Sequence, residues 1–266
     1  MEFWTVKTDK GFRFLSNLLS LGRRLVHEPL ELLCPATCAV CRTEIDDSSE
    51  VLCRQCWTHL QENLQSQGCP VCGHNVGQYA LIEGRCHRCQ RRRPVVNRVV
   101  RVGDYCDTLR DLILAFKFHR QSRLDKFLGD LLAAAIMGTP ELAEVDVLVP
   151  IPLHWRRRWS RKYDQAELLA RAAVQYLKQQ RSIRVSCDLV RVRNTPPQTS
   201  LSATKRLINL KGAFAVRPDH PFADKHICLI DDVTTTGTTL RVAAQTLRKA
   251  GARQISAAVL AVAANN

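Results

Sequence analysis

The chain has 266 residues, of which 45% are hydrophobic and 24% are charged. These ordinary values exclude collagen-like repeats, wholesale disorder and a bundle of membrane-spanning helices. Lysine and arginine outnumber the acidic residues and give a formal net charge of +14. Such a balance favours partners that carry phosphate, from nucleotides to nucleic acid.

The N-terminal segment is predicted to form a basic amphipathic helix over residues 12–27. Its apolar run is too short and too interrupted to span a membrane, and it lacks the small-residue cleavage pattern of a secretory signal. Two interpretations of this helix stay open: it packs on its own domain, or it docks on a partner or an anionic surface. We therefore expect a cytoplasmic protein with no transmembrane segment.

Nine of the twelve cysteines lie between positions 34 and 89, and eight of them form four Cys-x2-Cys pairs. The eight are Cys38, Cys41, Cys53, Cys56, Cys69, Cys72, Cys86 and Cys89. Each pair places two thiolates on one face of a turn, so two pairs close a tetrahedral zinc site. A disulfide framework would suit a secreted chain, and a redox dithiol rarely comes as four evenly spaced pairs. The sequence therefore predicts two structural zinc ions, which lower the net charge to about +10.

The pairing of these four turns is open from spacing alone. Sequential sites close the shorter loops, whereas a cross-brace joins the first pair to the third and the second to the fourth. Cys34, His74 or His87 could replace a neighbouring ligand. The remaining cysteines are predicted to be small buried hydrophobic residues: Cys106, Cys187 and Cys228.

Two roles are open for the metal sites. As structure, zinc replaces the core that about 55 residues with few large apolar side chains cannot build. As a recognition module, the region would grip nucleic acid or protein through the arginines at its exit, which a solvated basic linker would also explain. These are Arg85, Arg88, Arg91, Arg92, Arg93, Arg98 and Arg101. No catalytic role is expected, because closed all-cysteine sites leave no open coordination position.

The second half of the chain alternates strands and helices. Strands are predicted over 95–105, 145–150, 226–230 and 255–262, and helices over 108–118, 122–137, 165–180 and 239–250. Gly251 is predicted to end the last helix as a C-terminal cap. Mostly apolar strands alternating with helices predict an α/β fold, a parallel sheet flanked by helices on both faces. Ligands of such sheets bind beyond the carboxyl ends of the strands.

The segment after the strand 226–230 has the composition of a binding loop. Asp231 and Asp232 come first, a run of small residues follows, and then a helix begins. The run contains Thr234, Thr235, Thr236, Gly237, Thr238 and Thr239. Backbone N–H groups and the helix N-terminus predict a phosphate cradle, while the two acids suit hydroxyl groups or a bridging metal. Together they predict a site for a ribose phosphate, and a turn that merely caps the helix is the alternative.

Residues 231–239 resemble the phosphoribosyl pyrophosphate signature of type I phosphoribosyltransferases. Over residues 38–262 the chain is similar to the ComF family, whose members pair an N-terminal double zinc ribbon with this fold. The segment Lys117-Phe118-His119, the loop 149–154 followed by Arg156 and Arg161, and the region 193–214 resemble further family segments. The resemblance implies an N-terminal helical region (1–33), a double zinc ribbon (34–94) and a phosphoribosyltransferase-like domain (95–266).

The same resemblance implies roles for individual residues. Thr234 to Thr239 would hold the 5′-phosphate, and Asp231 and Asp232 the ribose hydroxyls, with Mg²⁺ bridging ribose and pyrophosphate. Arg156, Arg157 and Arg161 would face the pyrophosphate, whose developing charge guanidinium groups stabilise. Asp231, Asp232, Arg156 and Arg161 would thus be the catalytic residues. For Lys117 and Arg206, a surface ion pair or loop contact is an equal alternative.

Three departures from the family pattern bear on activity. Family members usually carry Arg-Gly-aromatic-Asn-Gln in the pyrophosphate loop, where this chain has Arg161-Lys162-Tyr163-Asp164-Gln165; lysine tolerates fewer backbone angles than glycine. Thr235 replaces the acid that acts on the purine ring in purine-salvage enzymes, which disfavours a purine acceptor. The usual basic ending after the last strand is absent, since residues 261–263 are Ala-Val-Ala.

Three hypotheses for the function are open. In the first, which the ComF resemblance implies, the chain is a non-catalytic binding protein for phosphoribosyl pyrophosphate or another ribose phosphate that serves DNA uptake and utilisation in natural competence, with single-stranded DNA or a helicase-like partner. Alternatively, it transfers phosphoribose to a non-purine acceptor. In the third, it is a zinc-stabilised adaptor with a vestigial pocket. Aromatic residues near the cysteines are sparse (Trp57, Tyr79), which disfavours direct stacking of single-stranded bases.

Overall fold

The computed structural model describes residues 36–263 except 78–79, 92–93, 119–121, 154–162, 180, 194–209 and 211. The predicted helix over 12–27 lies outside the described residues. The chain divides into two compact units, residues 1–53 and 54–266. Within the described part of the chain, none of the helices could span a bilayer.

A five-stranded sheet is the centre of the second unit. Its strands lie in the order β3 (Val99–Asp104), β9 (Gln254–Val262), β8 (His226–Thr234), β4 (Val147–Pro150) and β5 (Arg184–Val185), and every neighbouring pair is parallel. β8 and β9 are the longest strands and lie side by side in register from His226↔Gln254 to Thr234↔Val262. Because both faces are covered, these strands are apolar along most of their length, and all residues of β9 after Gln254 are buried.

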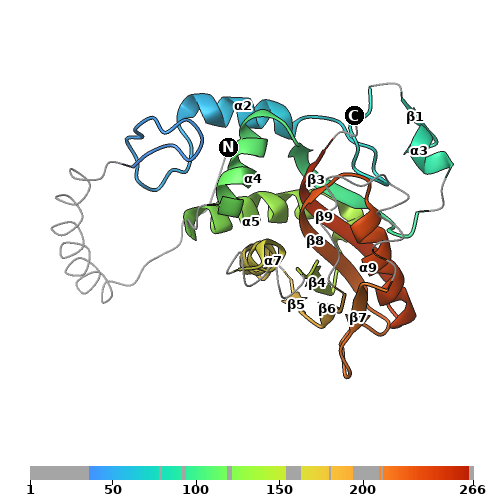
Figure 1. Cartoon of the computed structure of the whole chain (residues 1–266). Helices are drawn as coiled ribbons and strands as arrows, with labels where there is room; N and C mark the ends of the chain where they lie inside the picture. The colour runs from blue at the N-terminus through green and yellow to red at the C-terminus, as the bar shows by residue number, and fades with distance from the viewer. Residues whose placement is uncertain are drawn as a thin grey trace, which may run out of the picture. The chain divides into compact units, whose positions relative to one another are not determined.

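Helices cover both faces of this sheet (Figure 1). On one face, α5 (Ser122–Met137) packs on β3 and β9, α7 (Gln165–Leu177) packs on β8 and β4, and α4 (Asp107–Phe118) joins them. On the other face, α9 (Thr238–Lys249) packs on β8 and β9. The arrangement confirms the predicted α/β class and parallel sheet, because each crossover helix returns the chain to start the next parallel strand.

The sequence places the long elements well and misses the short ones. α5 has the predicted bounds, and Gly251 has the positive φ of +87° that a C-terminal cap requires. β8, however, extends four residues beyond its predicted end, so both acidic residues lie within the strand. The helix α2 (Arg54–Leu64) was not expected, since it has few apolar residues and buries only Cys56 and Leu60.

The remaining elements are short. They are β1 (Leu81–Ile82), β2 (Arg85–Cys86), α3 (His87–Gln90), the 3₁₀ turn η1 (Pro140–Leu142), β6 (Leu189–Arg191) and β7 (Phe214–Val216). β1 pairs with β2 and β6 pairs with β7, both antiparallel. The first pair lies within the cysteine region, and the second lies beside the large sheet through the contact of β7 with α9.

Candidate functional site

The eight paired cysteines gather into two groups of four. One group is Cys38, Cys41, Cys53 and Cys56, and the other is Cys69, Cys72, Cys86 and Cys89; within each, the sulfur atoms lie within 4.8 Å of one another. Individual sulfur pairs are 3.6 Å apart for Cys41–Cys53, 3.7 Å for Cys72–Cys86 and 4.0 Å for Cys69–Cys89. Zinc–sulfur bonds of about 2.3 Å at tetrahedral angles place sulfurs about 3.8 Å apart. Both groups therefore have the donor set and spacing of a closed zinc site.

This grouping settles the pairing. The first turn joins the second and the third joins the fourth, so the sites are sequential and the cross-brace is excluded. Neither His74 nor His87 belongs to a group, and Cys34 lies outside the described residues. Cys228 is fully buried in β8, as predicted, whereas Cys106 and Cys187 are only partly buried.

The local environment already favours a thiolate at one cysteine of each group. Hydrogen bonds from the side chain and the backbone of Thr43 lower the pKa of Cys41 to about 6. At Cys69, burial raises the pKa, but hydrogen bonds from backbone groups of Cys86, Cys72 and Val71 outweigh it and the pKa falls to about 7. Burial raises the pKa of Cys72 to about 11. Thiolates are the form that binds metal, so Cys41 and Cys69 are the cysteines whose surroundings favour the metal-binding form.

The second cysteine group is packed tightly on the edge of the large sheet. A methyl group added at Gly73 would lie 3.0 Å from Val262 and 3.2 Å from Val99, on β9 and β3. The Val99 N–H donates to the Pro70 carbonyl at 3.3 Å, and the Asn75 amide donates to Asp104 at 2.6 Å. This turn of the ribbon therefore covers part of the sheet face next to α9.

Two of the arginines proposed for recognition have structural partners instead. The Arg101 side chain is 6% exposed and pairs with Asp104, while it also donates to Ser66 Oγ at 3.0 Å and the Gln67 carbonyl at 3.0 Å. Arg98 pairs with Glu141 at 2.6 Å. Arg85, Arg88 and Arg91 are exposed. The basic cluster therefore contains two arginines in ion pairs within the fold, Arg98 and Arg101, and three exposed arginines.

The acidic pair lies at the carboxyl end of β8. Lys117, at the end of α4, forms an ion pair with Asp232 at 2.8 Å, and both side chains are less than 20% exposed. Burial raises the pKa of Asp231 well above its ordinary value, and the neighbouring Asp232 carboxylate raises it further. Lys117 and the Asp232 backbone N–H oppose that rise, and Asp164 adds to it. The sequence did not decide the role of Lys117, and the structure places it in contact with the acidic pair.

Two residues of the predicted pyrophosphate loop brace this end of the sheet. The Tyr163 hydroxyl donates to the carbonyls of Phe116 and Lys117 at 3.1 and 3.2 Å, so it fixes the end of α4 that carries Lys117. Asp164 caps α7 by accepting from the Glu167 N–H, and it also accepts from the Leu153 N–H at 2.9 Å. Arg156, Arg157, Arg161 and Lys162 lie outside the described residues.

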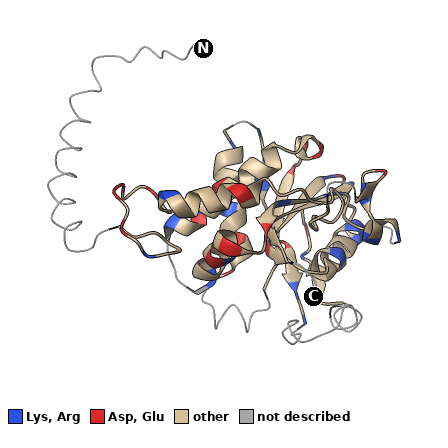
Figure 2. Ribbon diagram, turned by 90° about the horizontal axis from the view of Figure 1, so that it is seen from above, with Lys and Arg blue, Asp and Glu red and all other residues tan. Residues whose placement is uncertain are grey.

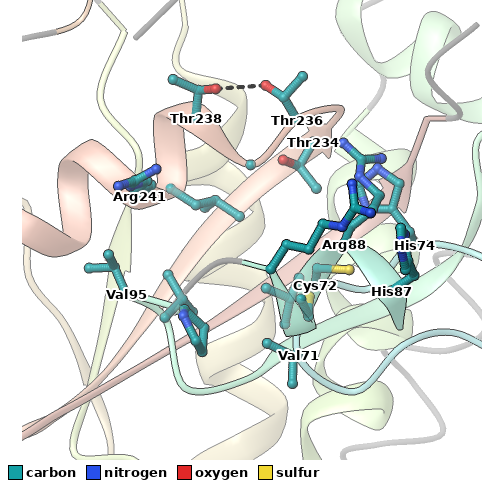
Figure 3. Close-up of a pocket in the computed structure, with 17 residues that line it drawn as sticks. Val71, Cys72, His74, His87, Arg88, Val95, Thr234, Thr236, Thr238 and Arg241 are labelled. Carbon is teal, nitrogen blue, oxygen red and sulfur yellow. Dashed lines mark hydrogen bonds between the residues drawn. The ribbon is translucent and has the colours of Figure 1, made fainter. Parts of the chain in front are cut away.

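The threonine run forms a tight turn between β8 and α9. Gly237 is the N-cap of α9 with a φ of +69°, a left-handed conformation that glycine adopts without strain. The hydroxyls of Thr236 and Thr238 are hydrogen-bonded to each other at 2.7 Å (Figure 3). The turn thus presents N–H groups and hydroxyls at the positive end of a helix, the arrangement that binds phosphate.

A cavity of about 570 Å³ lies between this turn and the second cysteine group. Figure 3 shows Thr234, Thr236 and Thr238 facing Arg88 and His74 across it. Burial lowers the pKa of His74, and the Arg88 guanidinium lowers it further, while the nearby backbone of Cys72 and Thr235 opposes this. Neither His74 nor Arg241 was singled out as a phosphate ligand from sequence, because nothing in the linear pattern places the cysteine region beside the threonine turn.

Comparison with known proteins agrees with both halves of this architecture. The phosphoribosyl transferase domain family matches residues 164–266, and the double zinc ribbon domain family matches residues 29–95. Competence protein F of Haemophilus influenzae is 33% identical over 82% of this chain and 93% of its own length. The chain belongs to the ComF family.

Other ComF relatives align over similar lengths. DNA utilization protein YhgH of Escherichia coli strain K12 is 34% identical over 84% of this chain and 96% of its own length. Competence protein ComFC of Bacillus subtilis is 28% identical over 76% of this chain and 80% of its own. The phosphoribosyltransferase fold and the double zinc ribbon with two four-cysteine groups are therefore features of this ComF protein.

Proposed function

We propose that this ComF protein binds phosphoribosyl pyrophosphate with Mg²⁺ and acts in the cytoplasm in DNA utilisation. The observation that carries the proposal is the junction of β8 and α9, where a partly buried acidic pair is followed at once by a glycine-capped threonine turn. A phosphate cradle and a diol-binding acid pair a few residues apart match the two ends of a ribose 5-phosphate.

Different residues would bind different groups of the proposed ligand. In this proposal, Thr234 to Thr239 hold the 5′-phosphate through N–H groups and hydroxyls, and Asp231 and Asp232 accept hydrogen bonds from the ribose hydroxyls. The carboxylate oxygens of the pair are the donors that Mg²⁺ prefers, so the acid pair fits that ion. Bound there, Mg²⁺ would neutralise charge on the pyrophosphate. Arg156, Arg157 and Arg161 complete the proposal as the pyrophosphate contacts.

Lys117 is assigned a positioning role in the same site. Its ammonium group holds one oxygen of Asp232 at 2.8 Å, which fixes the direction of that carboxylate and lowers the repulsion between the two acids. Tyr163 anchors the backbone that carries Lys117. We expect Lys117 to set the orientation of Asp232 rather than to contact the ribose.

Calorimetric titration of the zinc-loaded, full-length chain with phosphoribosyl pyrophosphate and Mg²⁺ tests the proposal. The wild type should bind, and the double variant Asp231→Asn/Asp232→Asn should bind at least 100-fold more weakly, because two charge-assisted contacts are lost. Asp130→Asn, an acid on α5 that pairs with Lys126, is the matched control and should bind like the wild type. An absence of binding by the wild type would contradict the proposal.

The link to DNA rests on the relatives, which are named for competence and for DNA utilisation. Single-stranded DNA or a helicase-like protein is the partner in this proposal, and the exposed Arg85, Arg88 and Arg91 supply the basic surface. Figure 2 shows blue residues gathered on the right of the view, where Figure 1 places α3 and α9. Charge reversal at Arg85 and Arg91 should weaken oligonucleotide binding and reduce its salt dependence; unchanged binding would remove DNA contact from this surface.

A further inference from the structure

The cavity beside the threonine turn extends away from the acidic pair. Its wall on one side is the turn and the first residues of α9, and its wall on the other side belongs to the second cysteine group (Figure 3). Neither Asp231 nor Asp232 is among the residues that line it. In the proposed function the 5′-phosphate contacts the threonine turn at one wall, and the ribose and pyrophosphate lie over the acids. The part of the cavity next to the second cysteine group therefore has no assigned occupant.

The lining has two chemical halves. Arg88, Arg91 and Arg241 supply three cations, and no aspartate or glutamate is among the lining residues. The rest of the lining is mixed: the threonine turn, two histidines and two cysteines supply polar groups, and an aliphatic part of the wall is formed by Val71, Pro94, Val95, Val96, Val99 and Leu240. A ligand that fits this lining carries an anionic group and an uncharged part that can pack on the aliphatic side chains.

Buried nitrogen atoms at the cavity lack partners. Nε of Arg241 is buried and has no hydrogen-bond partner among the described residues, and both ring nitrogens of His74 are buried with only poorly aligned backbone groups of Cys72 and Thr235 beside them. Leaving such groups without partners is costly, and a buried polar atom with none marks a place where a ligand or water completes the structure. These nitrogens lie on opposite walls, on the cysteine region and on α9, so one ligand between the walls can contact both.

We propose that this cavity binds a nucleoside monophosphate unit, with its base on the valine-lined wall and its phosphate between Arg88 and Arg241. The volume of about 570 Å³ lies within the range of small-molecule pockets, and a base with one phosphate uses both halves of the lining. A simple sugar phosphate would leave the aliphatic wall unused. The unit is either a free nucleotide or the terminal nucleotide of a DNA strand, since both present the same base and phosphate.

Titration of the zinc-loaded, full-length protein with dAMP tests the inference. The wild type should bind dAMP. In the Asp231→Asn/Asp232→Asn variant, which lacks the proposed ribose contacts, dAMP should bind more tightly than either ribose 5-phosphate or adenosine, because each of these offers half of the contacts in the cavity. Arg241→Ala and Arg88→Ala should each weaken dAMP binding at least tenfold. Lys249→Ala removes an exposed cation from the same helix, α9, and should leave binding within twofold of the wild type.

Two controls keep this test independent of folding and of the acidic pair. Zinc content and the thermal midpoint are measured for each variant, and Arg241→Ala, which is remote in sequence from the cysteines, is the deciding variant if Arg88→Ala loses zinc. Asp231→Asn/Asp232→Asn should keep dAMP binding. If the wild type fails to bind phosphoribosyl pyrophosphate but binds dAMP, the proposed function fails and this inference stands.

Other outcomes would overturn the inference. They are an absence of dAMP binding by the wild type, equal binding of dAMP and ribose 5-phosphate by the double aspartate variant, or loss of dAMP binding in that variant with no change in Arg241→Ala. A 5′-phosphorylated oligodeoxynucleotide distinguishes the two sources of the ligand. Binding at least tenfold tighter than that of dAMP assigns the cavity to a DNA end, and equal or weaker binding assigns it to a free nucleotide.

Discussion

The central strands and the cysteine turns belong to one chain but are held by different interactions. In β8 and β9, residues such as Leu229, Ile230 and Val259 are completely buried, and the sheet is stabilised by apolar packing from both faces. In the segment from Gly68 to Gln90, the described residues classed as buried include Cys69, Gly73 and Cys86, and no large aliphatic side chain is among them. The sheet carries its own core, whereas the cysteine segment depends on a metal and on the sheet that it packs against.

The cysteine segment also forms part of the cavity wall. Because it brings little core of its own, its apolar and basic side chains are free to line a cavity with the threonine turn. The sheet positions the threonine turn, and the cysteine segment supplies the opposite wall of the cavity. Removing the metal should therefore affect that wall more than the sheet.

The largest effect is expected from loss of a zinc ligand. Cys69→Ser should lower the zinc content from two ions to one per chain and open the segment around β1 and β2 to protease, since zinc contributes about 10–16 kcal/mol in small zinc domains. Cys187→Ser, at a cysteine outside both groups, is the control. Metal analysis and limited proteolysis measure both effects, and full retention of two zinc ions would contradict the assignment.

The stability of the sheet should depend on its buried side chains and not on zinc. Leu229→Ala on β8 removes a fully buried side chain, so the free energy of unfolding should fall by about 2–5 kcal/mol with zinc content unchanged. Val192→Ala, at a side chain that is 56% exposed, should cost less than about 0.5 kcal/mol. Denaturant titration measures both. A loss of zinc in Leu229→Ala would show that sheet and ribbon unfold as one unit.

Substitutions at two glycines of the cysteine segment separate the cost of backbone strain from the cost of disturbing its packing on the sheet. Gly73 and Gly84 both have positive φ, +72° and +70°, but only Gly73 has sheet atoms within 4 Å of an added methyl group. Gly84→Ala should cost about 1 kcal/mol from backbone strain alone, and Gly73→Ala about 2–3 kcal/mol because Val262 and Val99 must also move. Equal thermal midpoints for the two variants would contradict the tight contact with β3 and β9.

The smallest effect concerns pH and the acidic pair. The pKa of Asp231 is raised in the folded state, so above the unfolded value of about 3.9 the folded chain holds a proton that the unfolded chain releases. Stability from this group is therefore lost as the pH rises toward the folded pKa. Asp231→Asn should raise the thermal midpoint by a few degrees near pH 7, and the difference should vanish below pH 4. A variant less stable than the wild type at pH 7 would contradict this sign.

Much of this architecture was predictable because its signals are local in the chain. The spacing of Cys38, Cys41, Cys53 and Cys56 predicts a four-thiolate site, since each turn holds two ligands a few residues apart. The apolar run of β8 followed by acids, small hydroxyl residues and glycine predicts a strand, a phosphate turn and a helix. These features depend on residues within about ten positions of one another, so the local sequence is enough to predict them.

Contacts between distant segments were decided by the tertiary structure alone. Lys117 reaches Asp232 because α4 ends beside the carboxyl end of β8, and the Arg101 ion pair with Asp104 turns a predicted recognition residue into a brace. His74 and Arg241 are 167 positions apart, yet they line one cavity. The sequence by itself determined the two four-cysteine groups, the parallel sheet and the glycine-capped threonine turn. The packing of the cysteine segment on β3 and β9 decided what that turn faces, because side-chain packing over long sequence separations has no local pattern.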